Sequence, residues 1–234
     1  MSAILKRDLR SYFASPLGYV FIAAFLLVIN IYFYLYNVYS ASSDLTYTFE
    51  FMLSMMIYLI PILTMRTFSE DYKQKTDQLL LTSPVKLTGI VLGKVFAALI
   101  VFLIALAFTL LFVLVVALCG HVSTATVVGN YVAIIAVALT FISVGVFISS
   151  LTQNQLISCI ATLGAFLALY LFDYAYSYVN STLAKNIIYW LSLFRRYDSF
   201  VNGIFSFADF IYYLSIAGIF IFLTVRVLEK KRWS

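Results

Sequence analysis

The sequence predicts an all-α integral membrane protein with six transmembrane helices and one domain covering residues 1–234. Of these residues 64% are hydrophobic and only 11% are charged, whereas a soluble domain carries about a quarter charged residues. The apolar residues also come in runs close to the ~20 residues that cross a bilayer as a helix. The net charge of +5 does not indicate nucleic-acid binding, because Lys and Arg gather on the cytoplasmic loops of membrane proteins.

Six apolar runs are candidates for these spans. They cover residues 17–36, 51–65, 87–119, 131–151, 156–178 and 210–227. The second run is short, which leaves room for its helix to continue through Arg66 into the polar segment that follows. The third run is longer than a bilayer requires, and we expect it to project beyond the membrane.

Basic residues predict the orientation of the chain. They lie at both ends and around the segment between the second and third spans, as Lys6, Arg7, Arg10, Arg66, Lys73, Lys75, Lys86, Lys94, Arg226, Lys230, Lys231 and Arg232. The loops 37–50 and 120–130 contain none. The positive-inside rule therefore places both termini and residues 66–85 in the cytoplasm, an arrangement that six spans satisfy.

Residues 1–15 are predicted to form an amphipathic helix that lies in the cytoplasmic interface. Its apolar side chains share one helical face and its basic side chains lie largely off that face; the apolar set is Leu5, Leu9, Tyr12 and Phe13. Pro16 ends this helix before the first span. A disordered tail is the alternative. A cleaved signal peptide fits poorly, because the first apolar run is longer than the ~7–15 residues of such segments.

Residues 179–209 depart from the charge rule. This outer loop carries Lys185, Arg195 and Arg196, whose charge Asp198 and Asp209 partly offset. The apolar piece at 187–194 is too short to cross a bilayer. We therefore expect either a re-entrant segment or an amphipathic segment that lies on the membrane surface.

No catalytic or metal-binding pattern is recognisable in the sequence. Gly89, Gly93 and Lys94 come near to a phosphate-binding loop, but that loop needs one more residue between its glycines and Ser or Thr after its Lys. The better interpretation is a Gly-x-x-x-Gly pair, Gly89 and Gly93, that lets a neighbouring helix approach closely. We therefore expect this chain to bind no ATP, metal or other cofactor directly.

Asp173 is the one acidic residue well within a predicted span, near its outer end. Ionisable residues inside membranes usually mark ion or solute pathways. Asp173 is a candidate for an outer gate, together with Arg195, Arg196 and Asp198. Its carboxylate could equally reach the outer interface, and the sequence leaves both interpretations open.

The segment "RTFSEDYKQKTDQLLLTSPV" at residues 66–85 interrupts the apolar chain. Its acidic and basic residues have helical spacing, since Asp71 and Lys75 are an i,i+4 pair and Glu70 and Lys73 an i,i+3 pair. Thr67 and Glu70 also match a capping box. The segment is therefore able to form a helix.

The same segment keeps apolar residues on one side, namely Phe68, Tyr72 and Leu79, and Pro84 ends the element. We expect a short, solvated amphipathic helix that serves as a docking surface for a cytoplasmic partner. The alternative is a passive loop. A loop of about five polar residues would be enough to connect two spans, and this segment is much longer.

Several stretches of the chain resemble the membrane subunit of the type-2 class of ABC exporters. "LRSYFASPLGYVFIAAFLL" resembles the N-terminal interface helix and first span of that family. "LTMRTFSEDYKQKTDQLLLTSPV", followed by "GIVLGK", resembles its coupling region. "FRRYDSFVNGIFSFADFIYYLS" and "LEKKRW" resemble its outer re-entrant hairpin, last span and C-terminal end. The most similar subgroup includes the gliding-motility and copper-maturation permeases.

The resemblance implies a set of coupling residues, which are Phe68, Glu70, Asp71, Tyr72, Lys73, Thr76, Leu79, Leu80 and Pro84. Glu70, Asp71 and Lys73 are the candidates to face a separate ATPase. The chain departs from the family at Lys75, where Gly is frequent, and at residues 77–78, where Glu is frequent. The docking contacts themselves are therefore not transferred.

The resemblance also implies an assembly. Two permease subunits, as a homodimer or a heterodimer, would pair with two ABC ATPase subunits that bind the ATP and magnesium. Membrane lipid and an extracytoplasmic accessory protein are further expected partners, and the expected location is the inner (plasma) membrane of a bacterium. A stand-alone channel or secondary transporter and a non-transporting scaffold remain alternative functions, and the substrate is not predicted.

Overall fold

The computed structural model describes residues 2–76, 86–120, 123–176, 192–201, 203–204 and 206–233. Within these ranges the chain is mainly helical and contains no strand. Six helical stretches are long and apolar enough to cross a membrane: Pro16–Val38, Thr46–Lys73, Leu87–Leu118, Thr124–Leu151, Gln155–Tyr174 and Phe207–Arg232. The prediction of an all-α protein with six spans is confirmed, and the protein is a multi-pass integral membrane protein.

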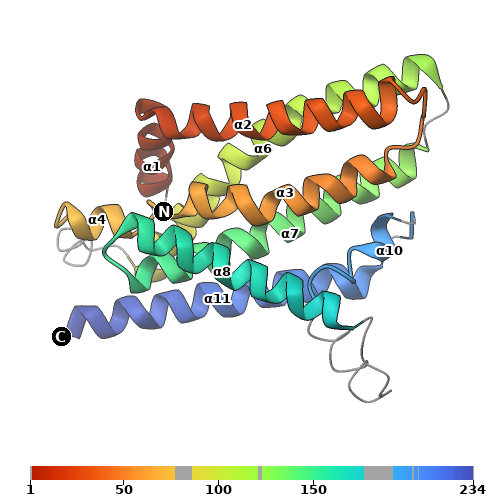
Figure 1. The fold of residues 1–234 in the computed structure, drawn as a ribbon. Helices are drawn as coiled ribbons and strands as arrows, with labels where there is room; N and C mark the ends of the chain where they lie inside the picture. Colours follow the sequence, from red (N-terminus) through yellow and green to blue (C-terminus); the bar gives the residue numbers. More distant parts are fainter. Residues whose placement is uncertain are drawn as a thin grey trace.

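The elements follow one another along the chain as α1 (Ser2–Ala14), α2 (Pro16–Phe33), the π-helix η1 (Tyr34–Val38), α3 (Thr46–Thr64), α4 (Ser69–Lys73), α6 (Leu87–Cys119), α7 (Thr124–Leu151), α8 (Gln155–Ala175), α10 (Asp198–Val201) and α11 (Phe207–Trp233). The long helices run side by side in a bundle, and α1 lies across one end of it (Figure 1). That end also carries α4 and both chain termini. We call it the terminal end, and we call the end that carries α10 the opposite end.

The N-terminal helix predicted from the sequence is present as α1. Ile4 and Tyr12 are buried, and Leu9 and Phe13 pack against the core. Pro16 occupies the first turn of α2, as its fixed φ favours. The corner between α1 and α2 is tight, because a Cβ at Gly18 would lie 2.8 Å from the carbonyl oxygen of Tyr12.

α7 forms the centre of the bundle and contacts α3, α6, α8 and α11. Phe141 and Ile142 are fully buried there. α3 approaches α7 so closely that a Cβ at Gly145 would collide with the side chain of Thr64, 2.9 Å from its Cβ. The Thr140 hydroxyl donates a 2.9 Å hydrogen bond to the carbonyl of Tyr213, which ties α7 to α11.

Several helices begin earlier than their apolar runs. α3 begins at Thr46 rather than residue 51, and α7 at Thr124 rather than residue 131. Hydrophobicity marks only the part of a helix within the hydrocarbon layer, whereas backbone hydrogen bonding continues through the polar turns outside it. Side chains before each helix cap it: Asp44 accepts from the Thr46 amide at 2.9 Å, and Ser123 accepts from the Thr126 amide.

The described part of residues 179–209 packs onto the opposite end of the bundle. Leu193, Phe194, Tyr197 and Phe200 are buried. Asn130 of α7 anchors this part by donating to the Phe200 carbonyl at 3.1 Å and accepting from the Tyr197 hydroxyl at 3.1 Å. Residues 179–191, including Lys185, lie outside the described residues, so the re-entrant segment stays a prediction.

Candidate functional site

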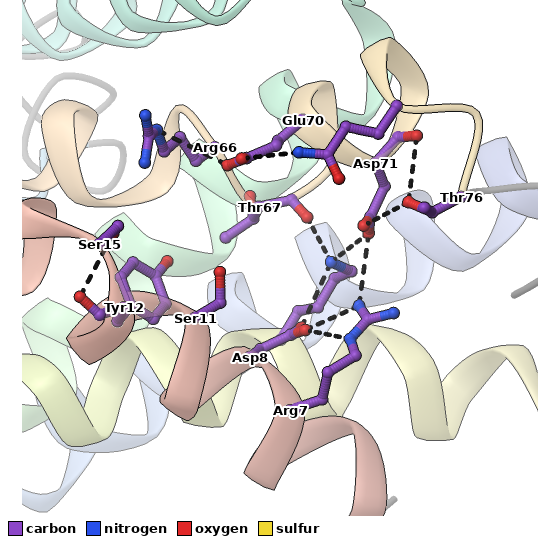
Figure 2. A pocket seen from close by; sticks show the side chains of 12 residues that line it. Arg7, Asp8, Ser11, Tyr12, Ser15, Arg66, Thr67, Glu70, Asp71 and Thr76 are labelled. Carbon is purple, nitrogen blue, oxygen red and sulfur yellow. Dashed lines mark hydrogen bonds and ion pairs between the residues drawn. The ribbon is translucent and has the colours of Figure 1, made fainter.

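A charged pocket of about 240 Å³ lies at the terminal end, between α1, α4 and α6 (Figure 2). α1 contributes Arg7, Asp8 and Tyr12, and α4 with the turn before it contributes Arg66, Glu70 and Asp71, among other residues. The pocket therefore joins the N-terminal helix to the segment predicted to contact a partner.

Lys94 of α6 lies at the centre of this site, and its side chain is only 3% exposed. Its ammonium is 2.6 Å from Oδ2 of Asp71 on α4 and 3.3 Å from Oδ2 of Asp8 on α1. Those two oxygens accept no directed hydrogen bond within the described residues, so the pairing is one of charge. Lys94 also donates to the Thr67 carbonyl and lies over the Phe68 ring, 4.8 Å from its centroid. One buried cation thus connects α1, α4 and α6.

Further contacts close the network between α1 and its neighbours. Arg7 Nε donates to Asp8 at 2.8 Å, and its terminal nitrogen is 3.6 Å from Asp71. Tyr12 donates a 2.9 Å hydrogen bond to the Leu63 carbonyl of α3. Burial, and then the Asp8 carboxylate, hold the pKa of the Tyr12 phenol well above its usual value. Tyr12 therefore stays a hydrogen-bond donor throughout the physiological pH range.

α4 is also held by α7 and α11. The Ser149 hydroxyl of α7 accepts from the amides of Phe68 and Ser69 at 3.1 and 3.3 Å. It thereby satisfies the free donors at the start of α4, which no side chain of α4 itself caps. Lys231 of α11 lies over the Tyr72 ring at 3.7 Å and donates to the Ser150 carbonyl at 2.9 Å. The C-terminal helix and the end of α7 therefore both hold α4 in place.

Within residues 66–76, the described part of the segment 66–85, the helix α4 is less solvated than predicted. α4 has five residues and begins at a buried Ser69. It ends before Lys75, whose φ of 56° lies in the left-handed region and so breaks the helix. The Thr76 hydroxyl donates to the Asp71 carboxylate at 3.0 Å and holds this exit turn.

The ion pairs predicted within residues 66–76 do not form, so this prediction is wrong. Asp71 pairs with Lys94 instead of Lys75, because the helix has ended at Lys75. Glu70 pairs with Arg66 at 3.6 Å and accepts from Gln74 at 3.0 Å rather than pairing with Lys73. The capping box does not form, since the Thr67 hydroxyl donates back to the Thr64 carbonyl at 2.7 Å.

The predicted coupling residues therefore separate into two groups. Phe68 is buried and Asp71 faces the pocket, whereas Lys73 is exposed and Glu70 partly exposed. Leu79, Leu80 and Pro84 lie outside the described residues. Gly93 lies where α1 crosses α6, since a Cβ there would lie 3.1 Å from Cγ2 of Ile4.

At the opposite end, the structure brings Asp173 and Arg195 together. Arg195 Nε lies 3.1 Å from the Asp173 carboxylate, which also accepts from Ser192 at 2.6 Å. Arg196 does not join this pair; it contacts Asp209 of α11 at 2.7 Å in a buried ion pair. Asp198 is exposed at the start of α10. Partial burial, and then the Asp173 carboxylate, raise the pKa of Asp198.

Sequence reasoning missed the residues that hold α4: Asp8, Lys94, Ser149 and Lys231. The position of Lys94 inside a long apolar run could have indicated its role, because an ammonium at such a position needs an anionic partner. Nothing in the sequence marked Ser149, because its importance comes from the approach of α4 to the end of α7.

The described residues form no group of three or more His, Cys, Asp or Glu side chains that could hold a metal ion. The fold and this site define a class: α-helical multi-pass membrane proteins in which charged contacts at one end link several spans. The family profile described as ABC-2 family transporter protein matches residues 2–229. The chain belongs to this family and is a transporter permease subunit, a membrane transport component. A comparison with curated proteins gives no match. Permeases of the family typically work with an ABC ATPase.

Proposed function

We propose that this chain is the permease of an ATP-driven exporter and that α4 receives movement from a separate ABC ATPase. The main support for this proposal is that Lys94, Ser149 and Lys231 bind α4 to α1, α6, α7 and α11. In this proposal the terminal end is cytoplasmic and the membrane is the inner membrane of a bacterium. Two permease copies would pair above two ATPase subunits, which would bind the ATP and magnesium. Membership of the gliding-motility and copper-maturation subgroup stays a prediction.

The contacts explain how a displacement of α4 would reach the membrane spans. A coupling element works only if its interactions differ between two states of the protein. Movement of α4 would pull on Lys94 in α6 and on Ser149 in α7. Both residues lie in the part of their helix that is close to the terminal end of the bundle. Long helices that pack tightly then carry the displacement toward the opposite end, either to move a solute or to transmit force to an extracytoplasmic partner.

The outward side of α4 is the surface proposed to contact the ATPase. Lys73 is exposed and the Glu70 side chain is 29% exposed, while Asp71 and Phe68 face the interior. We expect Glu70→Ala combined with Lys73→Ala to abolish co-purification of the ATPase, because both outward charges are removed while the contacts that hold α4 through Lys94, Ser149 and Lys231 stay. Co-purification from membranes, with the permease level measured in parallel, is the test.

Arg226→Ala with Glu229→Ala is a matched control. These residues form an exposed i,i+3 ion pair with a 2.7 Å contact on α11, at the same end of the bundle. The control removes the same number and signs of charge and should leave ATPase binding unchanged. Equal ATPase recovery with the α4 variant and the wild type, at equal membrane levels, would overturn the proposal.

At the opposite end we propose that the pair of Asp173 and Arg195 belongs to an outer gate, with Asp198 beside it. The Arg195–Asp173 contact links the described loop to α8, whereas Arg196 binds the loop to α11. A gate that opens between α8 and the loop would break the first pair and keep the second. If the purified chain alone in liposomes conducts ions or solutes without ATP, and Asp173→Asn changes this flux, the stand-alone transporter replaces the exporter.

A further inference from the structure

One side of the charged pocket at the terminal end is lined by hydrogen-bond donors. Arg66, in the turn before α4, lines it together with Ser11 of α1 and Ser15 at the corner between α1 and α2. In Figure 2 these side chains lie apart from the ion pairs that Asp8 and Asp71 make. We call Arg66, Ser11 and Ser15 the donor side of the pocket.

Much of the Arg66 guanidinium makes no contact with the described residues. Its Nε lies 3.4 Å from the side-chain oxygen of Gln155 and 3.6 Å from the Glu70 carboxylate. Its two terminal nitrogens make no hydrogen bond with a described residue, and the side chain is 34% exposed. A guanidinium presents a planar fork of N–H groups that matches the oxygens of a phosphate. Arg66 is therefore able to bind an anion that enters the pocket.

The two serines add hydroxyl groups to the donor side. The Ser15 amide donates to the Ser11 carbonyl at 3.1 Å, so the two residues lie one helical turn apart on the same face. Ser11 is exposed, and its hydroxyl makes no hydrogen bond with another described residue. The Ser15 hydroxyl makes only a 3.4 Å contact with the Tyr12 carbonyl among the described residues, which is long for an O–H donor. Both hydroxyls are therefore free to turn toward a ligand.

The acidic groups of the pocket already have partners. Asp8 and Asp71 pair with Lys94, and the Glu70 carboxylate accepts from Gln74 at 3.0 Å. Among the described lining groups, those left without a strong partner are therefore donors. Several donors grouped around one guanidinium recognise an anion with more than one acceptor oxygen.

The pocket lies where the polar headgroups of a bilayer are expected. α1 lies across the terminal end of the bundle, and α2 begins at the same corner (Figure 1). Tyr19, in the first turn of α2, is 59% exposed, and its ring packs edge-on against Phe13 of α1 with centroids 5.6 Å apart. Tyrosines are enriched at this level of membrane proteins. A phospholipid headgroup is therefore the nearest source of a phosphate.

We propose that Arg66, Ser11 and Ser15 bind a phosphate group and that a phospholipid headgroup supplies it. The Glu70 carboxylate lies beside Arg66. It repels inorganic phosphate, which carries up to two negative charges near neutral pH, more than it repels the singly charged phosphodiester of a lipid. A bound phosphate would link α1 to the turn before α4. Only this consequence involves the proposed function, because phosphate binding is measurable without the ATPase.

The experiment measures lipid binding to the purified full chain in detergent by native mass spectrometry. The probes are dioctanoyl phosphatidylglycerol and dioctanoylglycerol, which has the same acyl chains and no phosphate. Inorganic phosphate, equimolar with the lipid, is the competitor. We expect phosphatidylglycerol to bind more tightly than dioctanoylglycerol, and inorganic phosphate to displace little of it.

Variants of the donor side test which residues hold the phosphate. Arg66→Gln should weaken phosphatidylglycerol binding about tenfold or more, because charge-assisted hydrogen bonds are lost. Arg66→Lys should recover only part of the binding, because it keeps the charge but has no fork. Ser11→Ala with Ser15→Ala should weaken binding about fivefold. This pair keeps the contacts of Arg66, so it tests the site even if Arg66→Gln does not fold.

Arg10→Gln is the matched control, because it removes an exposed Arg of α1 that does not line the pocket. Its phosphatidylglycerol binding should equal that of the wild type. Equal binding of the two lipids, or equal binding by Arg66→Gln and Arg10→Gln, would overturn the site. Displacement of the lipid by equimolar inorganic phosphate would overturn the lipid as the source. ATPase docking is tested by other variants, Glu70→Ala with Lys73→Ala, so the two failures are distinguishable.

Discussion

Lys94 shows at the scale of one residue how this chain uses a buried charge. An ammonium in an apolar helix is tolerated only when anions compensate it, and here Asp8 and Asp71 come from two different elements. Charge pairing therefore determines where α1 and α4 lie relative to α6. A buried ion pair is not in itself strongly stabilising, but removal of one partner leaves the others uncompensated.

We expect Lys94→Met to destabilise the protein toward the lower end of the ~3–5 kcal/mol that loss of a buried ionic partner costs, because Asp8 and Asp71 then keep only the exposed Arg7 as a cation. Adding Asp8→Asn and Asp71→Asn should restore most of the stability but not the coupling to ATP hydrolysis. Thermal unfolding in detergent measures the first effect. Lys86→Met removes an exposed Lys at the start of α6 and is the matched control. An unchanged melting temperature in Lys94→Met would show that Lys94 does not hold the site together.

Asp198 gives a prediction about pH. Partial desolvation of the carboxyl, and then Asp173 and Glu50, raise the pKa of Asp198 in the folded protein, and Arg195 lowers it. A raised pKa means that the folded state favours the protonated carboxyl, so stability is lost as the pH rises from the ordinary value through the raised one. Asp198→Asn should therefore raise the melting temperature at pH 7.5, by only about 1–2 °C because the side chain is exposed and screened. The gain should shrink toward pH 4, and a gain that grows on acidification would contradict this explanation.

At the scale of elements, α4 depends on its neighbours for its existence. Isolated helices of five residues are not stable in water, because nucleation costs more than so few hydrogen bonds return. The hydroxyl oxygen of Ser149 on α7 accepts hydrogen bonds from the amides of Phe68 and Ser69 at the start of α4. The same contacts that would transmit movement are therefore also the contacts that form the helix.

Ser149→Ala should loosen α4 without unfolding the bundle. Loss of a helix cap costs about 1 kcal/mol, which corresponds to about fivefold faster local opening. Hydrogen exchange of a peptide covering residues 65–76 should show this acceleration. Ser143→Ala is the control, because the Ser143 hydroxyl bonds only to the Leu139 carbonyl in its own helix. Equal exchange in the two variants would mean that Ser149 does not hold α4.

At the scale of the whole molecule, both termini and α4 occupy one end of the bundle. Six spans that alternate in direction require this, and we propose from the basic residues of that end that it faces the cytoplasm. The two proposed functional regions, around Lys94 and around Asp173, lie at opposite ends of the bundle. Any coupling between them must pass through the spans.

Labelling from either side of the membrane tests this orientation. The labelling uses a variant with Cys119→Ser and Cys159→Ser, which has no native thiol. In this variant, Lys73→Cys should react with an impermeant reagent only from the cytoplasmic side. Ile204→Cys, whose native side chain is 65% exposed, should react only from outside. Both positions are accessible at opposite ends, so reversed labelling would overturn the topology rather than reflect poor access.

The six spans and their helical nature could be predicted from sequence because hydrophobic runs of bilayer length have only one common structural solution. The N-terminal helix was predictable as well, since its apolar residues and Pro16 are local signals. Boundaries were less accurate where α3 and α7 extend into polar turns. The contacts of residues 66–76 were predicted least well. Asp71 pairs with Lys94, which is near in space, and not with Lys75, which is near in sequence.

The sequence by itself determined that this protein is an apolar six-helix membrane protein with one charged segment between its second and third spans, because composition and periodicity act locally. Only the tertiary structure decided that Lys94 joins α1 to α4 and that Ser149 caps α4. Those features depend on which helices meet. That choice follows from packing over long sequence separations, such as the close approach of Gly145 and Thr64, which no local pattern records.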